Sequence, residues 1–145
     1  MKYYFFILTV FLCGCSSSLL FEKRSDNRLT TQLVKFDSAK LFYKVNELPK
    51  YALAFLKKEN IVMTDTGSSY INTDVHFDNV TPTSRIVFGG SAGKDLTFIV
   101  YESQGITTQS QLIVLKPLAK KEVSVEQKFI DCRPLTFWDL KKCIQ

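Results

Sequence analysis

Short runs of β-branched and aromatic residues, separated by turn residues, fill most of the chain after residue 60. The runs read IVMT, SYINTDVHF, SRIVFGG, DLTFIVYES, ITTQSQLIVLK and KEVSVEQKF, with DTGS, DNVTPT, GSAGK, QG and PLAK between them. Turn signals that recur about every ten residues are typical of antiparallel sheets. The pattern therefore predicts a mainly β domain. We expect either an antiparallel β-sandwich or an α+β domain with a helix packed on an antiparallel sheet.

Two of these runs also predict which faces of the sheet are buried. LTFIVY is an apolar run, which indicates a central strand buried on both faces. In VSVEQKF, the residues Val123, Val125 and Phe129 alternate with polar residues, so we expect that strand to expose one face to water.

The stretch before residue 60 mixes strand and helix signals. LTTQLVKF and AKLFYKV are short and β-rich, and they predict two strands joined by a turn at Asp37 and Ser38. NELPKYALAFLKKEN predicts the one substantial helix, because its apolar residues recur at helical spacing. These residues are Leu48, Tyr51, Ala52, Phe55 and Leu56. TFWDLKKC, near the C-terminus, predicts a short helical turn.

The first residues of the chain have the features of a secretory signal. Lys2 precedes an apolar run that ends at Leu12, and this run is too short to span a bilayer. LCGC follows, with Gly14 directly before Cys15, and it resembles the lipobox of bacterial lipoproteins. The resemblance implies cleavage after residue 14 and lipidation of Cys15. We therefore expect a signal peptide over residues 1–14, a lipidated tether over 15–28 and one globular domain over 29–145.

The lipobox resemblance also implies a location. Ser16 follows the lipidated cysteine, whereas an Asp at that position is the usual inner-membrane retention signal in enterobacterial lipoproteins. The expected location is the outer membrane, facing the periplasm. Acyl chains contribute about 0.8 kcal/mol per buried CH₂, so several of them would hold the protein on the membrane.

The two cysteines outside the LCGC motif are Cys132 and Cys143, both near the C-terminus. An exported protein meets an oxidising compartment, so a disulfide between them is the leading interpretation. The chain has no CxxC pair in this region and one histidine, which argues against a zinc site.

The sequence offers few residues for catalysis. Asp74, His76 and Asp78 alternate in DVHFD and would project from one face of a strand, which makes them candidate metal ligands, although a solvated polar face gives the same pattern. GGSAGKD departs from a phosphate-binding loop and is better explained as a hairpin connection. We therefore expect no enzyme activity and no cofactor.

The formal charge of +5 falls to +4 once Lys2 is removed with the signal peptide. The basic residues form separated lysine doublets, at 57–58, 120–121 and 141–142, and not a stripe. Nucleic-acid binding needs a basic stripe or a recognition motif. We expect no nucleic acid as a partner.

The order of elements gives a second resemblance. A tether, two strands, a helix containing YALAFL and then several strands, of which TFIVYES is the most apolar, is similar to the small outer-membrane lipoprotein of type VI secretion systems. That resemblance implies a transthyretin-like β-sandwich with an added helix, acting as an adaptor for another envelope protein. Two alternatives stay open: an assembly lipoprotein of the lipopolysaccharide-transport type, and a small binding lipoprotein that acts as an inhibitor, immunity or exclusion factor.

Overall fold

The computed structural model describes residues 23–25, 28–70, 82–104, 108–118 and 122–145. All the strands described lie in one seven-stranded sheet with the order β1-β7-β6-β5-β4-β2, and β3 pairs with the free part of β4. The strands are β1 (Lys23–Ser25), β2 (Lys40–Phe42), β3 (Met63–Thr64), β4 (Ser84–Ala92), β5 (Leu96–Gln104), β6 (Thr108–Pro117) and β7 (Val123–Ile130). The strand β1 pairs in parallel with β7, and β3 pairs in parallel with β4. The remaining strand pairs are antiparallel.

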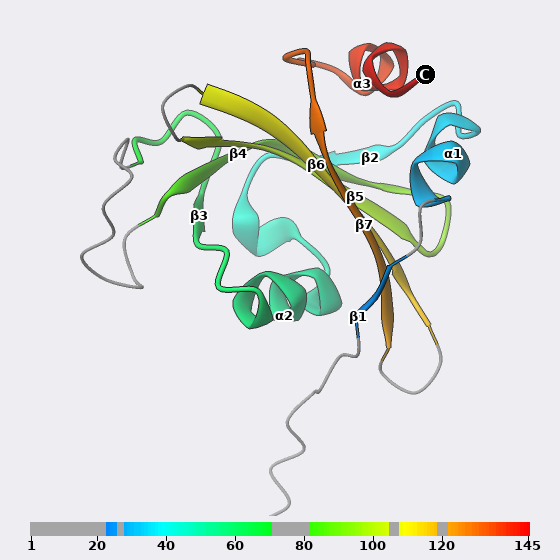
Figure 1. Ribbon diagram of the computed structural model, residues 1–145, viewed down its shortest axis with the longest axis horizontal. Coiled ribbons are helices and arrows are strands. Elements are labelled where there is room, and N and C mark those ends of the chain that lie inside the picture. Colours follow the sequence, from blue (N-terminus) through cyan, green and yellow to red (C-terminus); the bar gives the residue numbers. More distant parts are fainter. Residues whose placement is uncertain (1–22, 26–27, 71–81, 105–107, 119–121) are drawn as a thin grey trace, which may run out of the picture.

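Helices cover both faces of this sheet (Figure 1). The helix α2 (Lys50–Lys58), with the short 3₁₀ helix Val45–Glu47 before it, lies against one face, which we call the α2 face. The helices α1 (Leu29–Val34) and α3 (Phe137–Ile144) lie against the opposite face, the α1/α3 face. The mainly β, antiparallel prediction is confirmed. Of its two forms, helices packed on one antiparallel sheet describe the architecture, since helices stand where a sandwich would place a second sheet.

Each face has its own hydrophobic core. The core of the α2 face joins α2 to the sheet, and its buried members include Phe42, Phe55, Ile86, Ile99, Tyr101, Ile113 and Leu115. The core of the α1/α3 face joins α1 and α3 to the sheet, and its buried members include Leu29, Leu33, Phe88, Phe98, Leu112, Phe137 and Leu140. The central strand β5 contributes to both cores, with residues 96–101 all buried, which confirms the prediction for this strand.

One predicted strand is wrong. The segment LTTQLVKF forms the helix α1 and not a strand, although its β-branched residues favour a strand. Leu29 and Leu33 stand one helical turn apart, and both are fully buried on the α1/α3 face. Burial of this pair outweighs the intrinsic preference of the neighbouring threonines, because tertiary contacts routinely override propensity.

Two further expectations need correction. The C-terminal helix α3 is nearly as long as α2, so α2 is not the one substantial helix. The strand β7 does not expose one whole face, because Ser124 is buried and the aromatic Phe129 is 65% exposed. Exposure differs along the strand because α1 packs over the start of β7, whereas Phe129 lies near the other end of the strand. Residues 23–25 form β1 and pair with β7.

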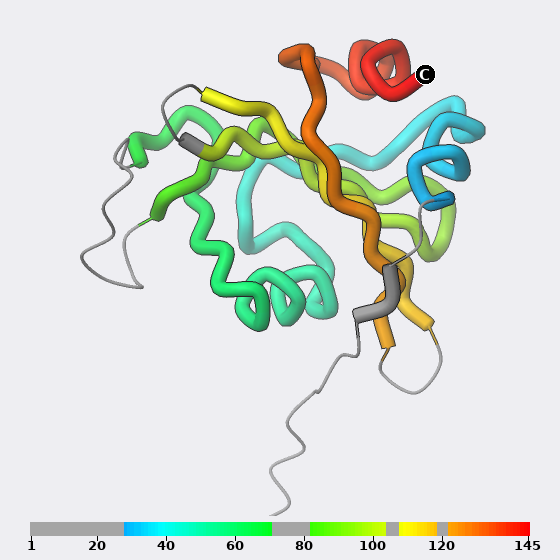
Figure 2. The backbone as a smooth tube through the Cα atoms, in the orientation of Figure 1, coloured from blue at the N-terminus to red at the C-terminus, as the bar shows by residue number. Residues whose placement is uncertain are grey.

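The C-terminal helix packs beside the first helix, although more than a hundred residues separate them (Figure 2). Lys141 of α3 donates a hydrogen bond from Nζ to the carbonyl oxygen of Phe36, at 2.9 Å, just after α1. A capping box begins α3. The side chain of Thr136 accepts a hydrogen bond from the backbone N–H of Asp139, and the side chain of Asp139 accepts one from the backbone N–H of Thr136.

The glycine-rich segment GGSAGKD lies in a β-hairpin, as expected: its residues 89–92 end β4, and residues 93–95 make the connection to β5. Gly93 has a φ of +65°, in the left-handed region that favours glycine, and a Cβ at this position would collide with the ring of Phe36. This segment therefore turns the chain and does not bind phosphate through a helix N-terminus.

Candidate functional site

A cavity of about 760 Å³ opens at the end of the sheet where β5 and β7 finish and β4 and β6 begin. Its polar wall includes Arg85, Glu102, Ser110 and Arg133. Phe129 also borders the cavity, although its register opposite Gln111 places it on the α2 face. Three of these residues form one row across adjacent strands on the α1/α3 face, because Arg85 pairs with Glu102 and Glu102 pairs with Ser110. The sheet register therefore builds one side of the cavity.

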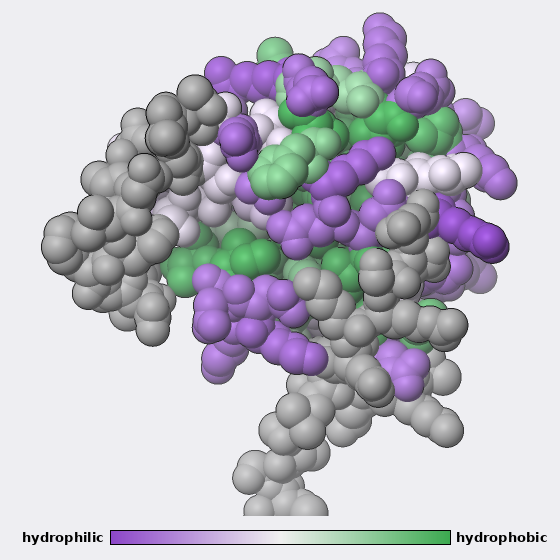
Figure 3. Space-filling view, in the orientation of Figure 1, coloured by the Kyte–Doolittle hydropathy of each residue, from purple (hydrophilic) through white to green (hydrophobic). Residues whose placement is uncertain are grey.

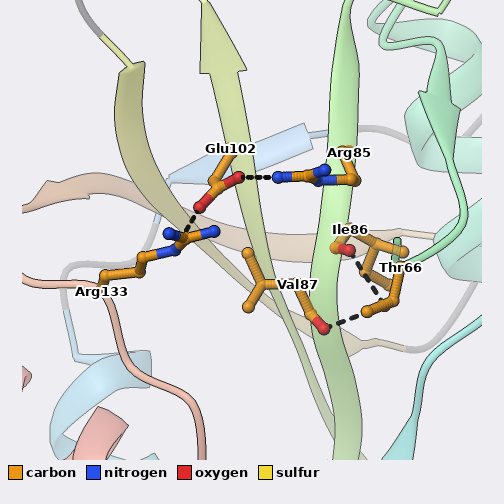
Figure 4. A network of polar contacts seen from close by, with 6 residues as sticks. All are labelled: Thr66, Arg85, Ile86, Val87, Glu102 and Arg133. Atoms are coloured by element: carbon orange, nitrogen blue, oxygen red, sulfur yellow. Dashed lines mark hydrogen bonds and ion pairs between the residues drawn. The ribbon is translucent and has the colours of Figure 1, made fainter. Parts of the chain in front are cut away.

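Glu102 is the one buried carboxylate among the described residues, with 2% of its side chain exposed. One carboxylate oxygen lies 2.7 Å from Nη2 of Arg85, and the other lies 2.7 Å from Nε of Arg133 (Figure 4). A buried carboxylate without such partners would destabilise the fold strongly. The two guanidinium groups make its burial at this position tolerable.

Arg85 is held from two directions. The ring of Tyr70 lies 5.1 Å from its guanidinium carbon, in cation–π contact, while Glu102 binds the edge of the group. The strand β4 has a register shift just beyond, between Ile86 and Phe88. The hydroxyl of Thr66 lies 3.0 Å and 2.9 Å from the carbonyl oxygens of Ile86 and Val87, so it contacts backbone groups at this irregularity (Figure 4).

Arg133 comes from the other end of the domain sequence. It follows Cys132 directly, and Cys132 is joined by a disulfide to Cys143 of α3, with the two Cα atoms 6.1 Å apart. The predicted bridge is thus confirmed, and its Cα separation lies in the usual range for disulfides. Because the bridge ties the segment after β7 to α3, it also fixes the start of the Arg133 side chain, 66% of which is exposed.

A second polar network occupies the next row of the sheet, on the α2 face. The hydroxyl of Tyr101 donates to Oε1 of Gln111 at 2.6 Å, and Nε2 of Gln127 donates to the Tyr101 oxygen at 2.9 Å. Gln111 in turn donates to Oγ of Ser103. Burial raises the pKa of Tyr101 to about 12, and the hydrogen bond from Gln127 offsets part of that rise. This network contains no charged side chain.

Four large apolar side chains of the described residues are exposed: Tyr43, Phe129, Leu135 and Trp138. The Nζ atom of Lys141 lies 4.6 Å from the ring centre of Trp138. On the face seen in Figure 3, hydrophobic residues lie in separate groups with hydrophilic residues between them. Of the four, Phe129 lines the cavity.

Of the site residues predicted from the sequence, some lie within the described part of the structure and others lie outside it. Cys132 and Cys143 are brought together in the disulfide. Cys15 and the candidate metal ligands Asp74, His76 and Asp78 lie outside the described residues, so those expectations stay predictions. Within the described ranges, the side chains of His, Cys, Asp and Glu form no group of three able to hold a metal ion.

Arg85, Glu102 and Arg133 were not among the residues predicted from the sequence. One signal was present: Glu102 directly follows the six buried residues of the most apolar run, and glutamate is rarely buried unless it is paired. Its partners were hidden, because Arg85 is opposite Glu102 through the β4–β5 register and Arg133 approaches through the disulfide-bridged segment.

The chain was compared with family models, with curated proteins and with solved structures, and nothing matched. No helix among the described residues has both the length and the apolar character needed to cross a membrane.

Proposed function

We propose that this protein is an exported lipoprotein, anchored by Cys15, that acts as a non-catalytic binding component of the cell envelope. The observation that carries the proposal is the Cys132–Cys143 disulfide in a small domain that follows an LCGC motif. Structural disulfides persist in oxidising compartments such as the bacterial periplasm, and a lipobox is the motif that sends a lipoprotein there. The two features lie at opposite ends of the chain and favour the same compartment.

The contacts of Glu102 favour binding over catalysis. A general acid or base must exchange a proton with a reacting group. Both oxygens of Glu102 are already engaged by guanidinium groups at 2.7 Å, so neither oxygen is free to contact a reacting group. The cavity is therefore suited to holding a ligand.

In this proposal the domain works as an adaptor on the periplasmic side of the outer membrane, holding another envelope protein at that membrane. A component of a secretion system is the first candidate, and a lipopolysaccharide-transport-type assembly lipoprotein is an alternative. The cavity favours a further candidate, a small binding lipoprotein such as an inhibitor, immunity or exclusion factor, because recognition by such a protein requires a shaped site.

Metabolic labelling with a radioactive fatty acid tests the anchor. We expect wild type to incorporate label and Cys15→Ser to incorporate none, leaving an uncleaved precursor or a soluble species. Label retained by Cys15→Ser would contradict the anchor. Cys13→Ser is the matched control, because it removes a neighbouring thiol and leaves the predicted lipidated cysteine in place.

Co-purification from detergent-solubilised envelopes tests the adaptor role, with wild type, His76→Ala and Cys15→Ser compared side by side. We expect His76→Ala to retain the same envelope protein as wild type and Cys15→Ser to lose it. Failure of wild type to retain any envelope protein, together with stoichiometric metal that His76→Ala loses, would overturn the proposal in favour of a metal site.

A further inference from the structure

We infer that the α2 face binds a neutral carbohydrate beside Phe129, with a sugar ring stacked on this aromatic side chain and sugar hydroxyl groups hydrogen-bonded to a set of neutral side chains next to it. The set consists of Ser103, Gln111 and Gln127. The inference goes beyond the proposed function, because it assigns a ligand class to a different face of the sheet from the charged row. It depends on the strand register, on the hydrogen bonds of the set and on the exposure of one aromatic ring.

The α2 face changes from apolar to neutral polar where its hydrophobic core ends. The last core residues on the strands β5, β6 and β7 are Tyr101, Ile113 and Val125. Two residues further towards the same end of the sheet, and therefore on the same face, these strands carry Ser103, Gln111 and Gln127. Gln111 lies opposite Tyr101 on one side and opposite Phe129 on the other, so the exposed ring belongs to this surface. None of these side chains is charged.

Within the described part of the chain, the hydrogen bonds of this set leave three polar positions unused. Both N–H groups of Gln127 are engaged, by Tyr101 and by Gln111, so its carbonyl oxygen is left as an acceptor. Gln111 donates one of its two side-chain N–H groups to Ser103, so the other is left as a donor. The hydroxyl of Ser103 accepts that bond and keeps its own hydrogen as a second donor.

Two donors and one acceptor, without a charge, match a polyhydroxylated ligand. Each sugar hydroxyl donates one hydrogen bond and accepts others, so neighbouring hydroxyl groups satisfy donors and acceptors together. An anion would use the two donors alone, and a cation would use the acceptor alone. A charged ligand would also lose water without gaining an ionic partner on this surface, which is costly.

The polar groups are ordered before any ligand arrives. The amide of Gln111 is held by Tyr101, Gln127 and Ser103 together, and Tyr101 is itself 3% exposed. A site that is ordered in advance loses less conformational entropy when it binds, which raises affinity.

The ring of Phe129 supplies the apolar contact. Its side chain is 65% exposed, and of the four large exposed apolar residues of the described chain it is the one on a strand next to this set. A sugar ring has a face lined by C–H groups, and stacking that face on an aromatic ring removes both from water. Hydroxyl groups at the edge of the same sugar can then reach Gln111 and Gln127.

Nuclear magnetic resonance titration of the ¹⁵N-labelled full chain, solubilised in a detergent without a sugar headgroup, tests the inference. The probes are two neutral disaccharides, cellobiose and N,N′-diacetylchitobiose. Sorbitol is the control, because it has hydroxyl groups but no ring. We expect one or both disaccharides to shift the side-chain amide signals of Gln111 and Gln127 with a Kd of about 1 mM, and sorbitol to leave them unchanged. The stronger disaccharide shows whether an N-acetyl group is recognised.

Variants locate the binding. Phe129→Ala is expected to weaken the binding of the active disaccharide at least about tenfold and to leave the chain folded, because the side chain is largely exposed. Phe129→Tyr keeps the ring and should stay within about twofold of wild type. Trp138→Ala removes an aromatic side chain that is 57% exposed on α3 and should also stay within about twofold. Gln127→Met keeps the length of the side chain but not its hydrogen bonds, and should weaken the binding about fivefold.

Four results would overturn the inference: equal shifts with sorbitol, equal weakening by Trp138→Ala and Phe129→Ala, loss of binding in Phe129→Tyr, or no shift with either disaccharide in folded wild type. Fatty-acid labelling of the same preparation keeps this inference and the proposed function distinguishable. Labelled protein that binds neither disaccharide contradicts the carbohydrate site alone, and unlabelled protein that binds one contradicts the anchor alone.

Discussion

Tyr101 and Glu102 are consecutive residues of β5, equally buried at 3% and 2% exposure, yet they enter opposite kinds of polar network. Tyr101 points to the α2 face and joins a neutral set of amides and hydroxyls. Glu102 points to the α1/α3 face and joins two guanidinium groups. A neutral network can be buried at low electrostatic cost, whereas a charged one requires exact partners. The stability of the charged row should therefore depend more strongly on each partner being present than that of the neutral row.

The largest effect should come from removing the charge of Glu102. We expect Glu102→Gln to lower the free energy of unfolding by about 3 kcal/mol, because two arginines then face each other without the carboxylate between them. Denaturant unfolding followed by circular dichroism measures the change. The control is Arg85→Leu combined with Glu102→Leu, which removes the buried pair and should recover part of the loss. A Glu102→Gln protein as stable as wild type would remove the contrast between the two rows.

Removing the disulfide should have the next largest effect, and on one face only. We expect Cys132→Ser combined with Cys143→Ser to lower the free energy of unfolding by about 2–3 kcal/mol, through the loss of a short covalent loop. Hydrogen exchange should then quicken in α3 and leave α2 unaffected. Equal quickening in α2 would mean that the two faces do not behave independently.

The neutral row should respond to alkaline pH. The pKa of Tyr101 is raised from its ordinary value of 10.0 to about 12, so the folded state holds this proton more tightly than the unfolded state. Its contribution is complete below pH 10 and is lost as the pH rises from 10 towards 12, which amounts to about 1.4 kcal/mol at pH 11. Tyr101→Phe is the control, and the difference between the two stability profiles isolates this group. A pH-independent difference would contradict the prediction.

Much of the sheet could be predicted from the sequence, because burial and turn chemistry are local signals. LTFIVY predicts a fully buried strand, and β5 is one; GGSAGKD predicts a hairpin connection, and Gly93 makes it. The segment LTTQLVKF could not be assigned in this way, since the burial of Leu29 and Leu33 depends on a sheet face built by residues far along the chain.

The candidate site was less predictable than the fold. Its residues Arg85, Glu102 and Arg133 come from β4, β5 and the segment after β7. They lie close together because of the strand register and the disulfide. Register follows from how each strand packs on its neighbours, which no single run of residues specifies. The part of the site that the sequence does indicate is Glu102, because this charged residue directly follows an apolar run.

The pairing of β1, β2 and β3 sets an order of events during synthesis. The strands β4 to β7 form successive antiparallel neighbours, each joined to the next along the chain, so their contacts are local. The strand β1 instead pairs with β7, and β2 and β3 pair with β4. In each case the partner strand, β7 or β4, leaves the ribosome later. Non-local pairing is slow, because the chain must close a long loop first. The N-terminal part therefore has no sheet to join until the C-terminal strands exist.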